Sequence, residues 1–132
     1  LTSKGFTYTF SKNLDQRILA DSQAFVEVVV NLIDNAIKYS SSKKHIDIST
    51  GKKDSFGYIS VKDQGVGISK QDQKHVFDKF YRVSSGDLAK SRGTGLGLSL
   101  VKEIVEGHGG FIELKSEPEK GSEFLMYFPL DK

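Results

Sequence analysis

Two asparagines lie within a segment whose apolar periodicity predicts a helix over residues 22–40. Asn31 and Asn35 are four residues apart and Lys38 follows, so the three side chains share one helix face. Asparagine is a mediocre former of helix interiors, so two of them among apolar residues need a reason. One reading is a solvated polar stripe. The other is a set of neutral oxygen ligands for Mg²⁺, with Lys38 as a positive charge for phosphate.

A second candidate site directly follows a predicted strand. Asp63 begins a loop that contains Gly65 and Gly67, and such a loop alone is typical of an ordinary turn. The functional alternative is a buried carboxylate that accepts a hydrogen bond from an exocyclic amine such as that of adenine, while the glycines let the purine lie against bare backbone. A guanine carbonyl at the same place would leave the carboxylate unpaired, at a cost of about 1–3 kcal/mol or more.

A third candidate is a glycine-rich loop that leads into a predicted helix over residues 98–105. Its sequence is Gly93-Thr94-Gly95-Leu96-Gly97-Leu98. Alternating glycines free backbone N–H groups to point at one place, and a helix start adds further unpaired donors, so the loop suits a phosphate group. The structural alternative is a flexible hinge. Neither the dinucleotide-binding nor the P-loop fingerprint is present.

An aromatic segment lies between these loops. The helical spacing of Phe77 and Phe80 predicts core positions, with Tyr81 beside them. Arg82 follows at the border of the polar, aperiodic segment 83–92, from which an arginine can reach a terminal phosphate.

Alternating and helical patterns predict the elements that must position these residues. We expect strands at 6–10, 17–20, 46–50, 58–62, 111–116 and 124–128, a polar turn at 51–57 and a short helix at 70–77. In the long helix, a wide buried face is expected from two rows: Phe25, Val29, Leu32 and Ala36, and Val26, Val30, Ile33 and Ile37. Because neighbouring strands form hairpins, the sequence predicts a largely antiparallel sheet of five to seven strands, covered on one face by about three helices.

The composition limits the kinds of protein and of site that the chain can form. The chain has 132 residues, 37% of them hydrophobic and 27% charged, which fits one globular domain over residues 1–132. There is no cysteine, so disulfides and thiolate metal sites are excluded. The net charge of +2 argues against a nucleic-acid surface. No run of 18 apolar residues or signal peptide is present in the printed sequence.

In this order the motifs resemble the catalytic, ATP-binding domain of bacterial two-component sensor histidine kinases, within the gyrase, heat-shock chaperone and mismatch-repair ATPase superfamily. The segment from Asn31 to Ser40 is similar to the N box, and Asp63 to Gly67 to the first glycine box. Phe77 to Arg82 is similar to the F box, Gly93 to Leu98 to the second glycine box, and Gly121 to Phe124 to the last. The resemblance runs from about Asp21 to Phe128.

The resemblance implies a Bergerat-type α/β two-layer sandwich, with a mixed, largely antiparallel sheet of about five strands covered on one face by three helices. It also implies that the domain binds ATP and Mg²⁺. Asn35 would ligate the metal, Asn31 would lie beside the phosphates, and Asp63 would take the adenine amine with Ser122 nearby. Catalytic roles are implied for Asn31, Lys38 and Arg82. The full set of implied nucleotide-binding residues is Asn31, Asn35, Lys38, Tyr39, Asp63, Gly65, Gly67, Ile68, Phe80, Tyr81, Arg82, Gly93, Thr94, Gly95, Leu96, Gly97, Leu98 and Ser122.

The residue at position 31 bears on whether the nucleotide is hydrolysed by water or its phosphate is transferred to an acceptor. Hydrolases of the superfamily carry a glutamate there, and an amide cannot act as a general base near pH 7. The resemblance therefore implies transfer of the γ-phosphate to a histidine, helped by alignment and charge neutralisation. The alternatives are a nucleotide-dependent binding or switch module (a degenerate kinase or an anti-sigma-like protein), a stand-alone ATPase and a serine-directed kinase.

The resemblance also implies partners. His45, His75 and His108 lack the acidic residue and proline that follow the family's acceptor histidine. We therefore expect the acceptor on a dimerisation/phosphoacceptor domain of the same parent protein, outside this chain, and little transfer without it. A response regulator would act downstream. The domain itself is expected to be monomeric, cytoplasmic, and part of a homodimeric parent, an inner-membrane sensor kinase.

Overall fold

The computed structural model describes residues 7–12, 18, 20–39, 44–78 and 97–130. Five strands form one sheet in the order β1-β2-β3-β5-β4, and β1 pairs with β2 in parallel while the other pairs are antiparallel. The strands are β1 (Thr7–Lys12), β2 (His45–Lys53), β3 (Phe56–Asp63), β4 (Phe111–Glu117) and β5 (Gly121–Pro129). The helices are α1 (Ser22–Lys38), α2 (Lys70–Gln73) and α3 (Gly97–Gly107). This architecture confirms the predicted α/β sandwich.

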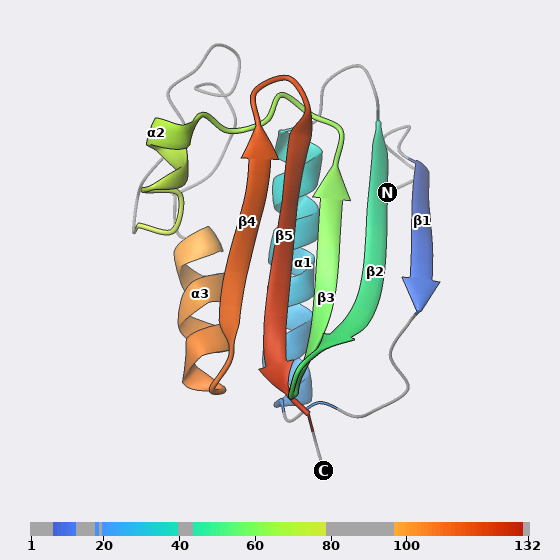
Figure 1. The fold of residues 1–132 in the computed structure, drawn as a ribbon, viewed down its shortest axis with the longest axis vertical. Coiled ribbons are helices and arrows are strands. Elements are labelled where there is room, and N and C mark those ends of the chain that lie inside the picture. The colour runs from blue at the N-terminus through green and yellow to red at the C-terminus, as the bar shows by residue number, and fades with distance from the viewer. Residues whose placement is uncertain (1–6, 13–17, 19, 40–43, 79–96, 131–132) are drawn as a thin grey trace.

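The core lies between the helices and one face of the sheet (Figure 1). Helix α1 lies behind β3 and β5, and α3 lies beside β4 (Figure 1). Asp21 starts α1 by accepting a hydrogen bond from the Ala24 N–H at 2.9 Å. The helices contribute Val28, Leu32, Ala36, Leu98, Val101 and Val105 to the core, against Ile46, Val61, Phe124, Met126 and Phe128 of the sheet.

The predicted buried face of α1 is wrong for the first half of one row, whose other members, Ile33 and Ile37, do pack against the core. Val26 and Val30 are 58% and 51% exposed, whereas Val28, which belongs to neither predicted row, is completely buried. Among the described residues, no helix lies behind β1 (Figure 1). The flank of α1 that carries Val26 and Val30 therefore has no neighbouring helix to bury it.

Strand β1 is also more exposed than its alternating sequence predicts. All six of its residues are exposed, and Tyr8 and Phe10 are 55% and 57% exposed. The prediction of a half-buried strand is wrong because β1 is an edge strand with no described helix behind it. Alternation indicates a strand but does not tell whether another layer covers it.

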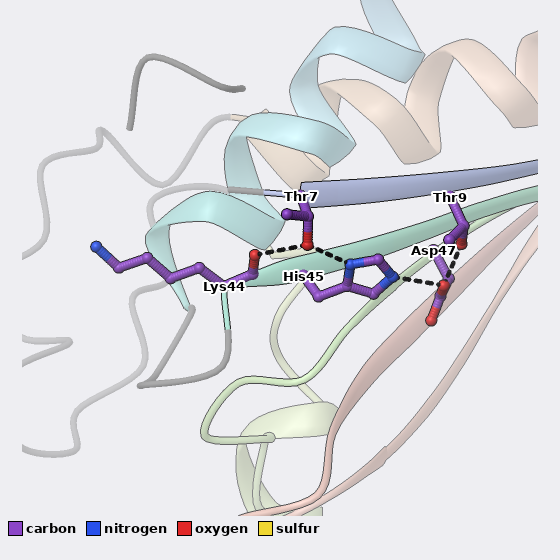
Figure 2. A network of polar contacts seen from close by, with 5 residues as sticks. All are labelled: Thr7, Thr9, Lys44, His45 and Asp47. Carbon is purple, nitrogen blue, oxygen red and sulfur yellow. Dashed lines mark hydrogen bonds and ion pairs between the residues drawn. The ribbon is translucent and has the colours of Figure 1, made fainter. Parts of the chain in front are cut away.

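Side chains on the other face of β1 hold it to β2 (Figure 2). Thr7 Oγ1 lies 2.6 Å from His45 Nδ1, and His45 Nε2 lies 3.1 Å from Asp47 Oδ1, which also accepts a hydrogen bond from Thr9. Because a carboxylate oxygen only accepts, Nε2 carries the proton in this contact. The hydrogen bond from the Thr9 hydroxyl, followed by that from His45, holds the pKa of Asp47 below its usual value, although burial opposes this shift.

The hairpin of β2 and β3 is tighter than predicted. Residues 51–57 are not one polar turn, because β2 continues to Lys53 and β3 starts at Phe56. The chain reverses at Asp54, whose φ is 56°. Gly51 lies within β2 and has no room for a side chain, because the Tyr58 ring lies across it: a Cβ at Gly51 would come within 2.4 Å of the Tyr58 hydroxyl.

Two short predicted elements also differ. The helix expected over 70–77 ends at Gln73 and continues as turns, although Phe77 packs against the core, with its ring 6.0 Å from that of Phe124. The strand expected over 17–20 is reduced to an isolated bridge between Ile18 and Leu130, and residues 17 and 19 lie outside the described residues.

Candidate functional site

Asp63 ends β3 as a carboxylate that is only 2% exposed. Its Oδ1 accepts hydrogen bonds from the backbone N–H groups of Gly65 at 2.9 Å and Ser122 at 3.2 Å. Its Oδ2 has no hydrogen-bond partner among the described residues. Burial raises the pKa of Asp63 to about 6, although the two N–H donors oppose this shift. At pH 7 the group is therefore ionised, with one free acceptor oxygen.

The glycines after Asp63 are required by the protein's own backbone. A Cβ at Gly65 would lie 1.9 Å from the Tyr39 carbonyl oxygen, and one at Gly67, where φ is +74°, would lie 1.9 Å from that of Glu117. The Val66 N–H also donates to Tyr39 O at 3.1 Å. The loop is thus pressed between the end of α1 and the β4–β5 turn, which is a different reason for glycine from the predicted purine contact.

Ser122 and Ser116 join this loop to the β4–β5 hairpin. Ser122 is 5% exposed and lies beside Asp63, as expected from the resemblance. Its hydroxyl lies 2.8 Å from that of Ser116, which also accepts a hydrogen bond from the Ile68 N–H at 2.8 Å. Sequence reasoning missed Ser116. The available signal was hairpin register, because Ser116 and Ser122 are direct partners across the pair.

The polar face of α1 carries two different amides. The Asn31 amide donates to the Glu27 carbonyl oxygen at 2.9 Å. The Asn35 Nδ2 atom is buried and has no hydrogen-bond partner among the described residues. An unpaired buried amide nitrogen costs about 1–3 kcal/mol, so a ligand that brings a hydrogen-bond acceptor to Asn35 Nδ2 would offset a cost that the protein alone carries.

The start of α3 lies next to this face. A Cβ on Gly97, the first residue of α3, would come within 3.4 Å of Asn31 Oδ1. The neighbouring Leu98 is 9% exposed and packs into the core, which anchors the helix start. Helix N–H groups that lack internal partners are therefore close to the Asn31 amide. Lys38 is exposed in the last turn of α1, and Tyr39 caps that helix.

The oxygen of the Asn35 amide is a kind of ligand that Mg²⁺ takes, although the atom of that amide left without a partner is its nitrogen, which binds hydrogen-bond acceptors. Within the described ranges there is no cluster of three His, Cys, Asp or Glu side chains that could hold a metal. Mg²⁺ commonly takes few protein ligands and keeps water and phosphate oxygens. The amide of Asn35 suits such a site, while a metal cage made by the protein is not seen among these residues.

The structure brings together α1, loop 63–68, the start of α3 and Ser122. Ile68 is buried at 1% exposure in that loop. Seven of the expected nucleotide-binding residues lie outside the described residues, and their placement stays a prediction: Phe80, Tyr81, Arg82, Gly93, Thr94, Gly95 and Leu96.

Comparison with known proteins agrees with this geometry. Residues 20–132 match the family described as histidine kinase-, DNA gyrase B- and HSP90-like ATPases. The chain belongs to this family, which confirms the resemblance found in its motifs.

The relatives that match include a sensor protein and sensor histidine kinases. The chain is 41% identical over 117 residues to the sensor protein RprX of Bacteroides fragilis, and 42% identical over 125 residues to the sensor histidine kinase WalK of Bacillus subtilis. These alignments cover 87% and 91% of this chain but only 22% and 20% of the relatives, so the chain spans about a fifth of their length.

A solved structure of full-length ShkA in complex with AMPPNP matches with a TM-score of 0.83 and 25% identity, over 99% of this chain and 27% of that one. Among the described helices of the present chain, none has the length and apolar character needed to cross a membrane.

Proposed function

We propose that this chain binds Mg-ATP and transfers the γ-phosphate to a histidine on a separate domain of the same parent protein. The observation that carries this proposal is Asp63: a buried carboxylate with one oxygen fixed by two backbone donors and the other without a partner. A purine covering this carboxylate would exclude water from its free oxygen, and the exocyclic amine of the purine would satisfy that oxygen. The sensor kinases among the relatives, and the ATP analogue AMPPNP in the ShkA structure, support this reading.

The phosphate end of the nucleotide would lie between α1 and the start of α3. Asn35 would hold Mg²⁺ through its amide oxygen, and Lys38 would reach a phosphate from the last turn of α1. When bound, Mg²⁺ supplies charge neutralisation to the phosphates. Asn31 would lie beside the phosphates, because the position of a Cβ on Gly97 is only 3.4 Å from its Oδ1.

Transfer to a histidine is favoured over hydrolysis by the amide of Asn31. Its Nδ2 already donates to the Glu27 carbonyl oxygen, and an amide oxygen is too weak a base to take a proton from water. An imidazole acceptor brings its own lone pair and needs no such base. The γ-phosphate is therefore preserved from water until an acceptor docks.

The length of the relatives supports the proposed partners of the reaction. WalK and RprX are about five times longer than their matched segments, so a parent protein of this kind has room for the phosphoacceptor domain. We propose that such a parent acts as a homodimeric, membrane-anchored sensor kinase, with a response regulator as the next acceptor.

Asn35→Ala tests the proposal. Calorimetric titration with Mg-ATP should give saturable binding to the unchanged chain. Binding to the variant should be at least about tenfold weaker, because the amide that would hold Mg²⁺ is lost; a tenfold change in Kd corresponds to about 1.4 kcal/mol. Asp34→Ala is the matched control, since Asp34 is the adjacent, exposed residue of α1.

Transfer is tested separately in the full parent protein. Phosphate from ATP should appear on a histidine as an acid-labile label. A protein that binds nucleotide and never labels its acceptor would instead support the nucleotide-dependent switch. Steady phosphate release without any acceptor would support a stand-alone ATPase.

A further inference from the structure

The hydroxyl of Ser116 contacts three groups at the base of the candidate site. The Ile68 N–H donates to it at 2.8 Å, it donates to the Gly121 carbonyl oxygen at 3.0 Å, and the Ser122 hydroxyl lies 2.8 Å away. These contacts link loop 63–68 to both strands of the β4–β5 hairpin. Neither the motifs nor the roles proposed above use Ser116.

The single proton of the Ser116 hydroxyl determines whether Ser122 can act as a donor or an acceptor toward a ligand. A serine hydroxyl has one proton and two lone pairs. The Gly121 oxygen can only accept and the Ile68 N–H can only donate, so all three contacts are made together only if Ser122 donates its own proton to Ser116. Ser122 then has lone pairs but no proton left for a ligand.

Asp63, next to Ser122, likewise offers a ligand only a hydrogen-bond acceptor. Its Oδ1 is held by the N–H groups of Gly65 and Ser122, and its free Oδ2 can only accept while the group is ionised. This end of the sheet thus offers two acceptors: Asp63 Oδ2, whose carboxylate is fixed by backbone N–H groups, and Ser122 Oγ, which is fixed by the Ser116 hydroxyl. An amine with two protons matches two acceptors, whereas a carbonyl matches neither.

Gln73 secures the same loop from the other side. Its Nε2 donates to the carbonyl oxygens of Ile68 at 2.7 Å and Ser116 at 3.0 Å. Because both partners are acceptors, this atom must be the amide nitrogen. The backbone N–H and C=O of Ile68 are therefore both bound, and the loop cannot move relative to β4 without breaking these bonds.

We propose that Ser116 is a positioning residue for recognition of the purine 6-amino group, acting by fixing Ser122 as an acceptor and by holding loop 63–68 against β4 and β5. This inference rests on the proposed ATP binding and adds to it a residue that sets base specificity. Ser116 itself is not assigned any contact with the nucleotide.

The test compares ATP with purine riboside triphosphate, which carries hydrogen in place of the 6-amino group. The Kd of each Mg-nucleotide is measured by calorimetry for the unchanged chain, Ser116→Ala, Ser116→Thr and Ser60→Ala. Ser60 is the matched control, because it is 2% exposed on β3 and donates to Glu123 at 2.5 Å, away from this network.

We expect Ser116→Ala to weaken ATP binding about tenfold and to leave binding of the analogue unchanged. The threonine variant, which keeps the hydroxyl, and Ser60→Ala should keep the preference for ATP. Ser122→Ala is the second variant if Ser116→Ala fails to fold, and it should lose the same preference.

Two results would overturn the inference, and they are distinguishable. Equal weakening of both nucleotides by Ser116→Ala, or no weakening at all, would reduce Ser116 to a structural role while leaving ATP binding intact. Failure of the unchanged chain to prefer ATP over the analogue would remove the contact between Asp63 and the amine, and the role of Ser116 with it.

Discussion

Loop 63–68 and strand β1 lie at the periphery of the same sheet and are held in opposite ways. The loop is bonded to α1, α2, β4 and β5, and its glycines leave no room for a single added carbon. Among the described residues, strand β1 is bonded to β2 and to Lys44 just before it, through its ladder and the polar network of Figure 2, while Tyr8 and Phe10 on its other face remain more than half exposed.

The difference indicates where the molecule requires a fixed geometry. Fixing a side chain in one position needs neighbours from several elements, and the loop has them around Asp63. Strand β1 contributes backbone pairing but little buried surface. Substitutions should therefore cost far more in the loop than in β1, for reasons independent of any ligand.

The largest expected effect is that of Gly67→Ala. The new Cβ would meet the Glu117 oxygen at 1.9 Å and would be strained at a φ of +74°. We expect the free energy of unfolding to fall by at least about 3 kcal/mol in urea titrations. Gly107→Ala is the matched control, because no atom lies within 4 Å of its added Cβ, and it should leave stability unchanged or slightly higher. Equal effects of the two variants would contradict this account.

Asp63→Asn should separate stability from binding. The pKa of Asp63 is raised from 3.8 to about 6 in the folded state, so protonation favours folding. The contribution of the protonated Asp63 to the free energy of unfolding is complete below about pH 4 and is lost as the pH rises through 6. At pH 7 the neutral variant should therefore be more stable by up to about 3 kcal/mol, while its affinity for ATP should fall about 10- to 100-fold.

Urea unfolding at a series of pH values checks the first part of this prediction. The gain in stability of Asp63→Asn should be full near pH 7 and should shrink toward pH 4, where the unchanged protein is itself protonated. A variant that is less stable than the unchanged chain at pH 7 would show that the carboxylate is not strained by its burial.

The smallest effect is expected at β1. Phe10→Ala removes a ring that is 57% exposed, so the free energy of unfolding should change by less than about 1 kcal/mol. Ile46→Ala, in the neighbouring strand and completely buried, should cost about 2–5 kcal/mol. A large loss for Phe10→Ala in urea titrations would mean that β1 is held more firmly than its exposure indicates.

The sequence predicts where loop 63–68 and strand β1 lie, but not why the loop is tightly held and the strand is exposed. The helical period located α1, alternation located the strands, and the position of Asp63 at a strand end marked the loop. Burial of Val26 and Tyr8 could not be judged, because it depends on which strands the helices cover. The reason for Gly65 and Gly67 lay in carbonyl groups from distant parts of the chain. Ser116 was hidden because its role depends on register across a turn.

The parallel pairing of β1 with β2 has a consequence for how the chain assembles. The β2–β3 and β4–β5 pairs close across short reversals, whereas pairing Thr7 with His45 must close a loop that contains all of α1. Long closures cost more chain entropy and are made late. Both hairpins, and with them both sides of the Asp63 loop, can therefore form before the edge strand docks.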